Sequence, residues 1–214
     1  MKQIWTLVLT LALLALGSLA NAAKVGEPAP DFTAADSNGK LHKLADFKGK
    51  TVVLEWHNQQ CPFVRSQYQG KMQNLQAKWT KKGVLWFSVV SSAPGTEGYV
   101  ESTQANEDVK QTHAHVTGTF LDPRGVVGGA YGAKTTPHMF IINSSGVLIY
   151  NGAIDNAPLE DSIVVKNKDG EIYVNYVDRA LQEVIVEKKA KASMPSITPY
   201  GCHVKYSNKM ANLQ

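Results

Sequence analysis

Several features that would narrow the class of this protein are scarce in its 214 residues. There are only two cysteines, so the chain can form at most one intramolecular disulfide. The formal net charge is only +4 and is spread along the chain, which argues against nucleic acid as a partner. Beyond the N-terminal segment, no apolar run approaches the roughly 20 residues that a membrane-spanning helix needs. The composition is that of a globular chain, long enough for one domain with a sizeable core.

The one long apolar run lies at the N-terminus. Lys2 is followed by apolar residues 4–16, and residues 20–22 read Ala-Asn-Ala, an A-x-A cleavage site. This pattern is typical of a secretory signal peptide over residues 1–22, and it predicts a mature chain that starts at Ala23. The alternative is an uncleaved anchor, but the run is short for a membrane span. We therefore expect secretion across the inner membrane, into the periplasm, with no stable membrane insertion afterwards.

Export changes how the two cysteines are interpreted, because compartments outside the inner membrane are usually oxidising. Cys61 lies in the predicted main domain, residues 23–192, and Cys202 lies in a C-terminal extension, residues 193–214. Pro195, Pro199 and Gly201 exclude a regular helix in the extension. The extension could therefore fold back, and a Cys61–Cys202 bond could be permanent or could form and break.

The most informative stretch is residues 51–65, which read TVVLEWHNQQCPFVR. It predicts a short apolar strand at 51–56, a polar turn at 57–60, and then Cys61 with Pro62 at the start of a helix. Proline is well tolerated in the first helical turn. The free N–H groups at a helix start favour a thiolate over a thiol. The spacing predicts that Cys61 is the reaction centre.

The rest of the chain predicts alternating strands and helices. Asn38-Gly39 is typical of a hairpin turn. We expect helices at 62–82, 102–113 and 177–191, and strands at 84–90, 139–143 and 147–153, the last two antiparallel. Residues 155–176 form an insertion with a polar turn at 166–170 and either a short strand at 171–174 or no regular structure.

Four motifs together resemble the thioredoxin-like superfamily, in its redoxin branch of AhpC/TSA peroxiredoxins and exported TlpA-like thiol oxidoreductases. They are APDF at 29–32, the strand and turn before Cys61, FLDPRGVVGGAY at 120–131, and Thr136-Pro137. The resemblance implies an α/β thioredoxin fold, a central mixed sheet flanked by helices. Here that fold would carry an N-terminal β-hairpin, an insertion before the last helix and a C-terminal tail.

The resemblance also implies roles for individual residues. Cys61 matches the nucleophilic cysteine and Arg65 the basic residue after the motif, whereas Val64 stands where the family has its second cysteine. Pro137 matches a proline that is cis and faces the nucleophile, leaving the backbone of Thr136 free to pair with a substrate chain. Pro62 and His138 flank these two landmarks, and we include both in the predicted substrate-binding set.

Because Val64 replaces the nearby thiol, another group must complete the cycle. Cys202 is the internal candidate, and a thiol of a partner protein or a small molecule is the external one. The alternative is a permanent clamp, which would enclose about 140 residues and stabilise the fold by roughly 5 kcal/mol. The position of Cys61 at a predicted helix start favours redox chemistry.

Three residues near Cys61 could move protons. Glu55 occupies an apolar strand, where burial of a carboxylate would raise its pKa and suit it to proton transfer, although it could equally face a cavity or pair with a lysine. His57 could stabilise a thiolate or be an exposed turn residue. His138, directly after the predicted cis-proline, could approach the same site.

We therefore expect a thiol-disulfide oxidoreductase that acts on a protein thiol or disulfide, needs no cofactor and draws on an external reductant of unspecified kind. The runner-up is a peroxiredoxin-like thiol peroxidase with antioxidant activity. Leu54 and Asn58 stand where peroxiredoxins have their proline and threonine, and about Pro137 where they have an arginine. A non-enzymatic alternative is a copper or zinc carrier, although no metal-ligand spacing is present and His113 and His115 suggest a solvated loop.

Overall fold

The computed structural model describes residues 23–159 and 172–207. The predicted signal peptide, most of the predicted insertion and the last seven residues lie outside these ranges. Within the described residues, no helix combines the length and apolar character needed to span a bilayer.

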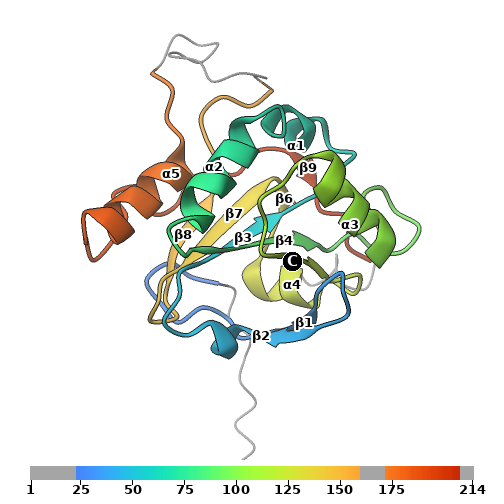
Figure 1. Cartoon of the computed structure of the whole chain (residues 1–214), viewed down its shortest axis with the longest axis horizontal. Helices are drawn as coiled ribbons and strands as arrows, with labels where there is room; N and C mark the ends of the chain where they lie inside the picture. The colour runs from blue at the N-terminus through green and yellow to red at the C-terminus, as the bar shows by residue number, and fades with distance from the viewer. Residues whose placement is uncertain (1–22, 160–171, 208–214) are drawn as a thin grey trace, which may run out of the picture.

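A five-stranded mixed sheet organises the molecule (Figure 1). Its strands are β3 (Val52–Trp56), β4 (Leu85–Val90), β5 (Gly118–Leu121), β7 (His138–Ile142) and β8 (Leu148–Gly152). The order is β5-β4-β3-β7-β8, in which β3, β4 and β5 are parallel while β7 and β8 each run antiparallel to their neighbours. This is the predicted thioredoxin arrangement, with the continuous apolar strand β4 inside the sheet as expected.

Both faces of the sheet are buried, because strand side chains alternate between them. Val53 packs with α2 (Lys71–Thr80) and α5 (Tyr176–Leu181) on one face, whereas Val52 and Leu54 pack with α4 (Val126–Tyr131) on the other. Figure 1 shows the first face covered by helices and the second covered by α4 and the N-terminal hairpin. That hairpin is the one predicted from Asn38-Gly39, with β1 (Thr33–Ala35) antiparallel to β2 (Leu41–Lys43), and a 3-10 turn (Leu44–Phe47) follows it.

The helix predicted over 62–82 is wrong as a continuous element. It consists of α1 (Pro62–Gln67) and α2, separated at Gly70, whose φ of 106° has the left-handed sign that favours glycine. The Gln73 side chain accepts from the Gly70 N–H and starts α2 anew. The apolar spacing continued across the break, so periodicity alone did not reveal it.

Helices at 102–113 and 177–191 were predicted with the correct type but not the correct ends. The first is α3 (Ser102–Gln111). The second is α5, which continues as a π-helical turn (Gln182–Val186) and ends there, well before residue 191. Its last apolar residue, Val186, is already 46% exposed. The lysine-rich stretch beyond it has no large apolar side chains to pack against the protein, and such packing is what stabilises most helices.

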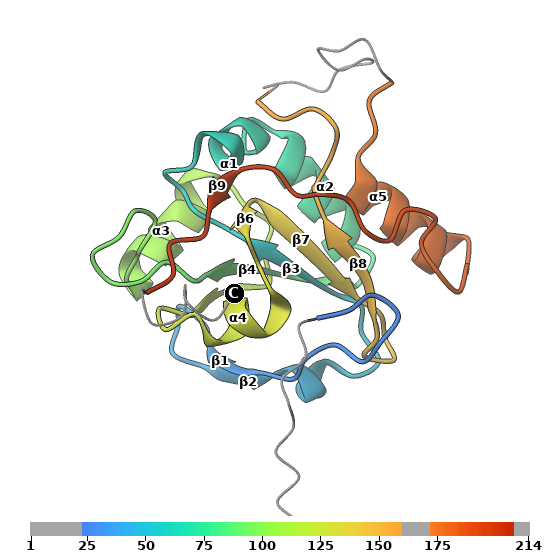
Figure 2. The same ribbon diagram turned by 180° about the vertical axis from the view of Figure 1, so that it is seen from behind.

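The C-terminal tail crosses the sheet edge and then the top of the molecule (Figure 2). Pro195 and Ile197 exchange backbone hydrogen bonds with Asn151 at the free edge of β8. Further on, β9 (Cys202–His203) pairs antiparallel with β6 (Thr135–Thr136). As predicted, the extension is irregular apart from the two residues of β9, and it folds back against the main domain along most of its described length.

A substitution at Gly152 tests whether the tail is docked against β8. A Cβ built there would lie 2.3 Å from the carbonyl oxygen of Ile197, so Gly152→Ala must push the tail away from β8. We expect a loss of about 1–3 kcal/mol in the free energy of unfolding, measured by urea denaturation, and earlier proteolytic cleavage in the tail. Gly118→Ala in β5 is the matched control, because its nearest contacts are at an ordinary 3.6 Å. Equal effects of the two substitutions would contradict the docked tail.

Candidate functional site

Cys61 lies where the end of β3 approaches the loop before β7. It is the residue that precedes α1, its N–H donates to the Asn58 carbonyl at 3.0 Å, and Pro62 is the first helical residue. Opposite it, the Thr136-Pro137 peptide bond is cis, as the resemblance implied. The Cys61 Sγ is 3.0 Å from the carbonyl oxygen of Thr136. The structure therefore brings together the predicted nucleophile, the helix start and the cis-proline.

Cys202 reaches the same point from the far end of the chain. The β6–β9 pairing sets Cys202 opposite Thr136, and the two sulfur atoms lie 2.7 Å apart. Both residues are free thiols. A disulfide has an S–S distance of about 2.0 Å, so only a small displacement separates this arrangement from a bond. Cys61 is fully buried at 0% exposure, whereas Cys202 is partly exposed.

The two sulfurs differ in acidity. Burial disfavours the Cys61 thiolate, but hydrogen bonds from Cys202, Thr136 and the backbone of Val64 outweigh it and lower the pKa of Cys61. Burial and then the hydrogen bond and negative charge of Cys61 raise the pKa of Cys202 to about 12, and Glu97 adds to the rise. Of the two sulfurs, Cys61 is therefore the more acidic, and Cys202 holds its proton more tightly.

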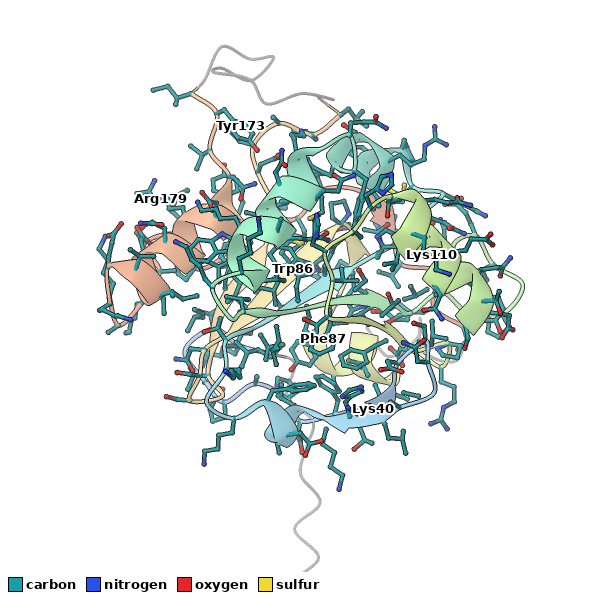
Figure 3. All side chains as sticks on the ribbon, in the orientation of Figure 1. Lys40, Trp86, Phe87, Lys110, Tyr173 and Arg179 are labelled. Atoms are coloured by element: carbon teal, nitrogen blue, oxygen red, sulfur yellow. The ribbon has the colours of Figure 1, made fainter. Side chains whose placement is uncertain are left out.

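Glu55 lies beneath this site on β3, fully buried. Its carboxylate accepts hydrogen bonds from Tyr68 at 2.7 Å, Gln76 at 3.1 Å and Trp86 at 2.8 Å. Figure 3 shows Trp86 in the interior, while Lys40 and Lys110 lie at the periphery. The carboxylate thus pairs with no lysine. Three neutral donors satisfy its oxygens.

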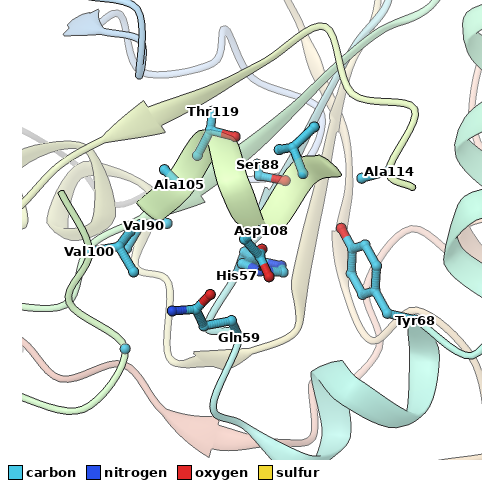
Figure 4. A pocket seen from close by; sticks show the side chains of 12 residues that line it. His57, Gln59, Tyr68, Ser88, Val90, Val100, Ala105, Asp108, Ala114 and Thr119 are labelled. Carbon is cyan, nitrogen blue, oxygen red and sulfur yellow. The ribbon is translucent and has the colours of Figure 1, made fainter. Parts of the chain in front are cut away.

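His57 is buried at 6% exposure rather than lying in an exposed turn. Its Nε2 is 2.8 Å from Asp108 and its Nδ1 is 3.5 Å from Glu55. Burial lowers the pKa of His57, but the hydrogen bonds and charges of the two carboxylates raise it to about 9. His57, Asp108 and Tyr68 line a cavity of about 10 Å³, room for one water molecule (Figure 4). Sequence reasoning missed Asp108, since nothing links it to His57 along the chain.

The remaining predicted residues have separate environments. His138 is buried, lies 2.7 Å from Asn151 through Nε2 and accepts the Lys134 N–H at Nδ1. Burial is the main cause that lowers the pKa of His138 to about 4, so the ring is neutral. Arg65 is exposed and forms no ion pair with any described residue. Among residues 23–159 and 172–207, no set of three His, Cys, Asp or Glu side chains could hold a metal ion.

Comparison with known proteins identifies the family. The Redoxin family model matches residues 24–182, which is most of the chain. The chain belongs to the Redoxin family. The thiol-disulfide oxidoreductase ResA of Bacillus thuringiensis subsp. konkukian is 29% identical to this redoxin over 126 residues, 59% of this chain and 68% of that protein.

Solved structures agree with the fold. A hypothetical protein of Sinorhizobium meliloti 1021 matches with a TM-score of 0.72 and 21% identity, over 88% of this redoxin and 97% of that chain. A protein of Chlorobium tepidum, provisionally assigned as the thiol:disulfide interchange protein DsbE, matches with a TM-score of 0.53 and 23% identity, over 78% and 98% of the two chains. At these identities the likeness concerns the fold alone.

The His57–Asp108 pair predicts a pH dependence of stability. The folded pKa of about 9 lies above the unfolded value near 6.5, so the contribution is complete below about pH 6.5 and is lost as pH rises to about 9. We expect a loss of roughly 3 kcal/mol in the free energy of unfolding across this window. Urea denaturation of a Cys61→Ser, Cys202→Ser protein would measure it without thiol titration. Asp108→Asn in the same background should make the profile shallower, because only Glu55 would then raise the pKa of His57, and an unchanged slope would contradict the pairing.

The hydrogen bond between the two sulfurs makes a second prediction. Cys202→Ser keeps an O–H that can donate to the Cys61 thiolate, whereas Cys202→Ala removes the donor. The pKa of Cys61 should therefore be higher in the alanine variant than in the serine variant. The pH dependence of thiolate absorbance near 240 nm reports it directly, since each variant has a single cysteine. Identical titrations would show that Cys202 does not stabilise the thiolate.

Proposed function

We propose that this redoxin is an exported thiol-disulfide oxidoreductase in which Cys61 is the nucleophile and Cys202 the resolving thiol. The observation that carries the proposal is the pairing of β9 with β6, which places the two sulfurs 2.7 Å apart next to the cis-proline. The curated relative at 29% identity is named a thiol-disulfide oxidoreductase, which supports this class of reaction. Export rests on the sequence of residues 1–22.

The reaction consists of two exchanges. The Cys61 thiolate attacks a substrate disulfide, forms a mixed disulfide with one substrate sulfur and releases the other as a thiolate. Cys202 then gives up its proton to solvent or the departing group and attacks Cys61. The Cys61–Cys202 bond forms, and the second substrate thiolate leaves. The substrate gains two electrons, the enzyme loses two, and an external dithiol must restore it by the reverse exchanges.

The difference in acidity between the two sulfurs determines which of them reacts first. While Cys61 is a thiolate, its charge and hydrogen bond hold the proton on Cys202. Once Cys61 is in a mixed disulfide, that negative charge is gone. The pKa of Cys202 then falls, and a fraction of it becomes a thiolate that can attack. The resolving thiol is therefore activated by formation of the intermediate it must resolve.

Disulfide exchange is favoured over peroxide reduction by the residues around Cys61. Leu54 is buried in the apolar core and offers no polar group. The Asn58 amide is occupied, since it donates to Glu97 at 3.1 Å and accepts the Gln60 N–H at 2.8 Å. Neither position supplies the hydroxyl expected of a peroxiredoxin. A carrier of copper or zinc is less favoured because both nitrogens of His138 already have partners.

Insulin reduction with a dithiol reductant tests the assignment. We expect Cys61→Ser to reduce the rate to the uncatalysed background, and Cys202→Ser to accumulate a mixed disulfide visible by non-reducing mass spectrometry. Rapid hydrogen peroxide consumption that Cys61→Ser abolishes would instead identify a peroxidase. Bound copper or zinc retained through purification, with neither activity, would identify a carrier. Mass analysis of the periplasmic fraction should find a chain that starts at Ala23.

A further inference from the structure

Three side chains, those of Tyr200, Asp155 and Gln67, form a hydrogen-bonded cluster close to the two sulfurs, here called the Tyr200 group. The Tyr200 hydroxyl donates to Asp155 Oδ1 at 2.6 Å, and the Gln67 amide donates to Tyr200 at 2.9 Å and to Asp155 Oδ2 at 3.0 Å. Asp155 is 1% exposed and Gln67 is fully buried. These residues come from the tail, the segment after β8 and α1. The group therefore fastens the tail both to the sheet edge and to the helix that begins after Cys61.

Tyr200 and its contacts are arranged closely around Cys61 and Cys202. Tyr200 is two residues before Cys202, and its ring lies 5.8 Å from that of Phe63, two residues after Cys61. Between them, Gly201 has a φ of 130°, and a Cβ there would lie 2.1 Å from the Thr136 carbonyl oxygen. The tail thus passes directly from the Tyr200 anchor onto the backbone of β6, with no room for a side chain in between.

The β6–β9 ladder alone is a weak means of holding Cys202 in place. It has only two residue pairs, and the Thr136 hydroxyl contact to the Cys202 carbonyl is long, at 3.4 Å. Charge-assisted hydrogen bonds such as that from Tyr200 to the Asp155 carboxylate are stronger than neutral ones. The Tyr200 group therefore holds the tail on the N-terminal side of Cys202, while the Val204 N–H, which donates to the Lys134 carbonyl at 3.0 Å, holds it on the C-terminal side.

We propose that Tyr200 is a positioning residue of the exchange reaction, which holds Cys202 within reach of Cys61 during resolution of the mixed disulfide. The inference rests on the proposed function and specifies how its second step is achieved. The first step, attack by Cys61, does not need the anchor. Loss of the anchor should leave the first step at least as fast, since the strand covering Cys61 is held less firmly, and should slow the second.

The chain offers a matched control. Tyr173 donates its hydroxyl to the same carboxylate, Asp155 Oδ2, at 3.1 Å, but it is not on the tail. Tyr200→Phe and Tyr173→Phe thus each remove one phenolic donor to Asp155, and Tyr200→Phe keeps a ring against Phe63. Gln67→Met is a further variant, since it removes the amide that donates to both Tyr200 and Asp155.

The experiment uses the reduced mature protein and the aromatic disulfide 5,5′-dithiobis(2-nitrobenzoate), followed by stopped flow. Attack by Cys61 releases one aryl thiolate, and attack by Cys202 on the mixed disulfide releases a second and leaves Cys61–Cys202. In Tyr200→Phe we expect the second phase to slow by about tenfold while the first does not slow, with Gln67→Met also slowed in the second phase. The equilibrium of the Cys61–Cys202 bond against dithiothreitol should shift toward the dithiol by a similar factor. Tyr173→Phe should leave both readouts unchanged.

The outcomes separate the two proposals. If Cys202→Ser still releases the second aryl thiolate at the normal rate, Cys202 does not resolve the intermediate and the proposed function fails. If Cys202→Ser abolishes that phase but Tyr200→Phe behaves like Tyr173→Phe, the function stands and the positioning role is overturned. A general loss of structure in Tyr200→Phe would expose the buried Cys61 and would appear as a lower urea midpoint of the reduced protein than that of Tyr173→Phe. Slowing of the second phase in Gln67→Met at an unchanged urea midpoint would then decide the question.

Discussion

The site depends on one short backbone pairing, that of β9 with β6. Edge strands next to a cis-proline expose N–H and C=O groups that another extended segment can bind. Here the chain's own C-terminus occupies that edge, and Cys202 is the residue set opposite Thr136. The burial of Cys61, the hydrogen bond that lowers its pKa and the supply of a second sulfur all follow from this pairing. Without it, Cys61 would be a single thiol with no internal partner.

The Cys61–Cys202 pair and the cluster of Glu55, His57 and Asp108 lie near each other but form separate hydrogen-bonded groups. In the sulfur pair, hydrogen bonds from Cys202, Thr136 and the Val64 backbone favour the thiolate form of Cys61. The acid-base side chains nearby belong to a separate cluster, in which the His57 cation lies between Glu55 and Asp108. The two carboxylates stabilise the His57 cation, and three further hydrogen-bond donors hold Glu55 in place. Loss of the His57 charge would leave the buried carboxylates without their cation, which is costly. The cluster therefore contributes to the stability of the fold, and proton transfer by Glu55 or His57 stays a prediction.

The sequence was sufficient for features encoded locally. The strand and turn before Cys61, the hairpin at Asn38-Gly39 and the buried strand β4 follow from patterns within a dozen residues. The cis state of Pro137 came from family resemblance, not from local physics. Gly70 was present in the sequence, but the apolar spacing on both sides of it favoured one helix, and only the structure shows that α1 ends at Gln67 and α2 begins at Lys71.

Long-range contacts account for what local reasoning could not supply. Asp108 meets His57 from 51 residues away, and Tyr200 meets Asp155 from 45 residues away. In each case the sequence shows an ordinary polar residue in a helix or a tail, with no spacing rule that links it to its partner. Glu55 was identified as a buried acid, but its partners, Tyr68, Gln76 and Trp86, come from three different parts of the chain.

The distance along the chain between the two sulfurs, 141 residues, gives the proposed redox pair a property that a Cys-x-x-Cys pair lacks. A disulfide within one helical turn closes a small loop and changes the unfolded state little. A bond that closes a loop of this length stabilises the folded protein by roughly 5 kcal/mol in the chain-entropy model. In the proposed oxidised state, a Cys61–Cys202 bond would hold the tail over Cys61, whereas in the reduced protein only hydrogen bonds and packing do so. Reduction would therefore weaken the cover over Cys61 at the stage when the proposed nucleophile must meet a substrate.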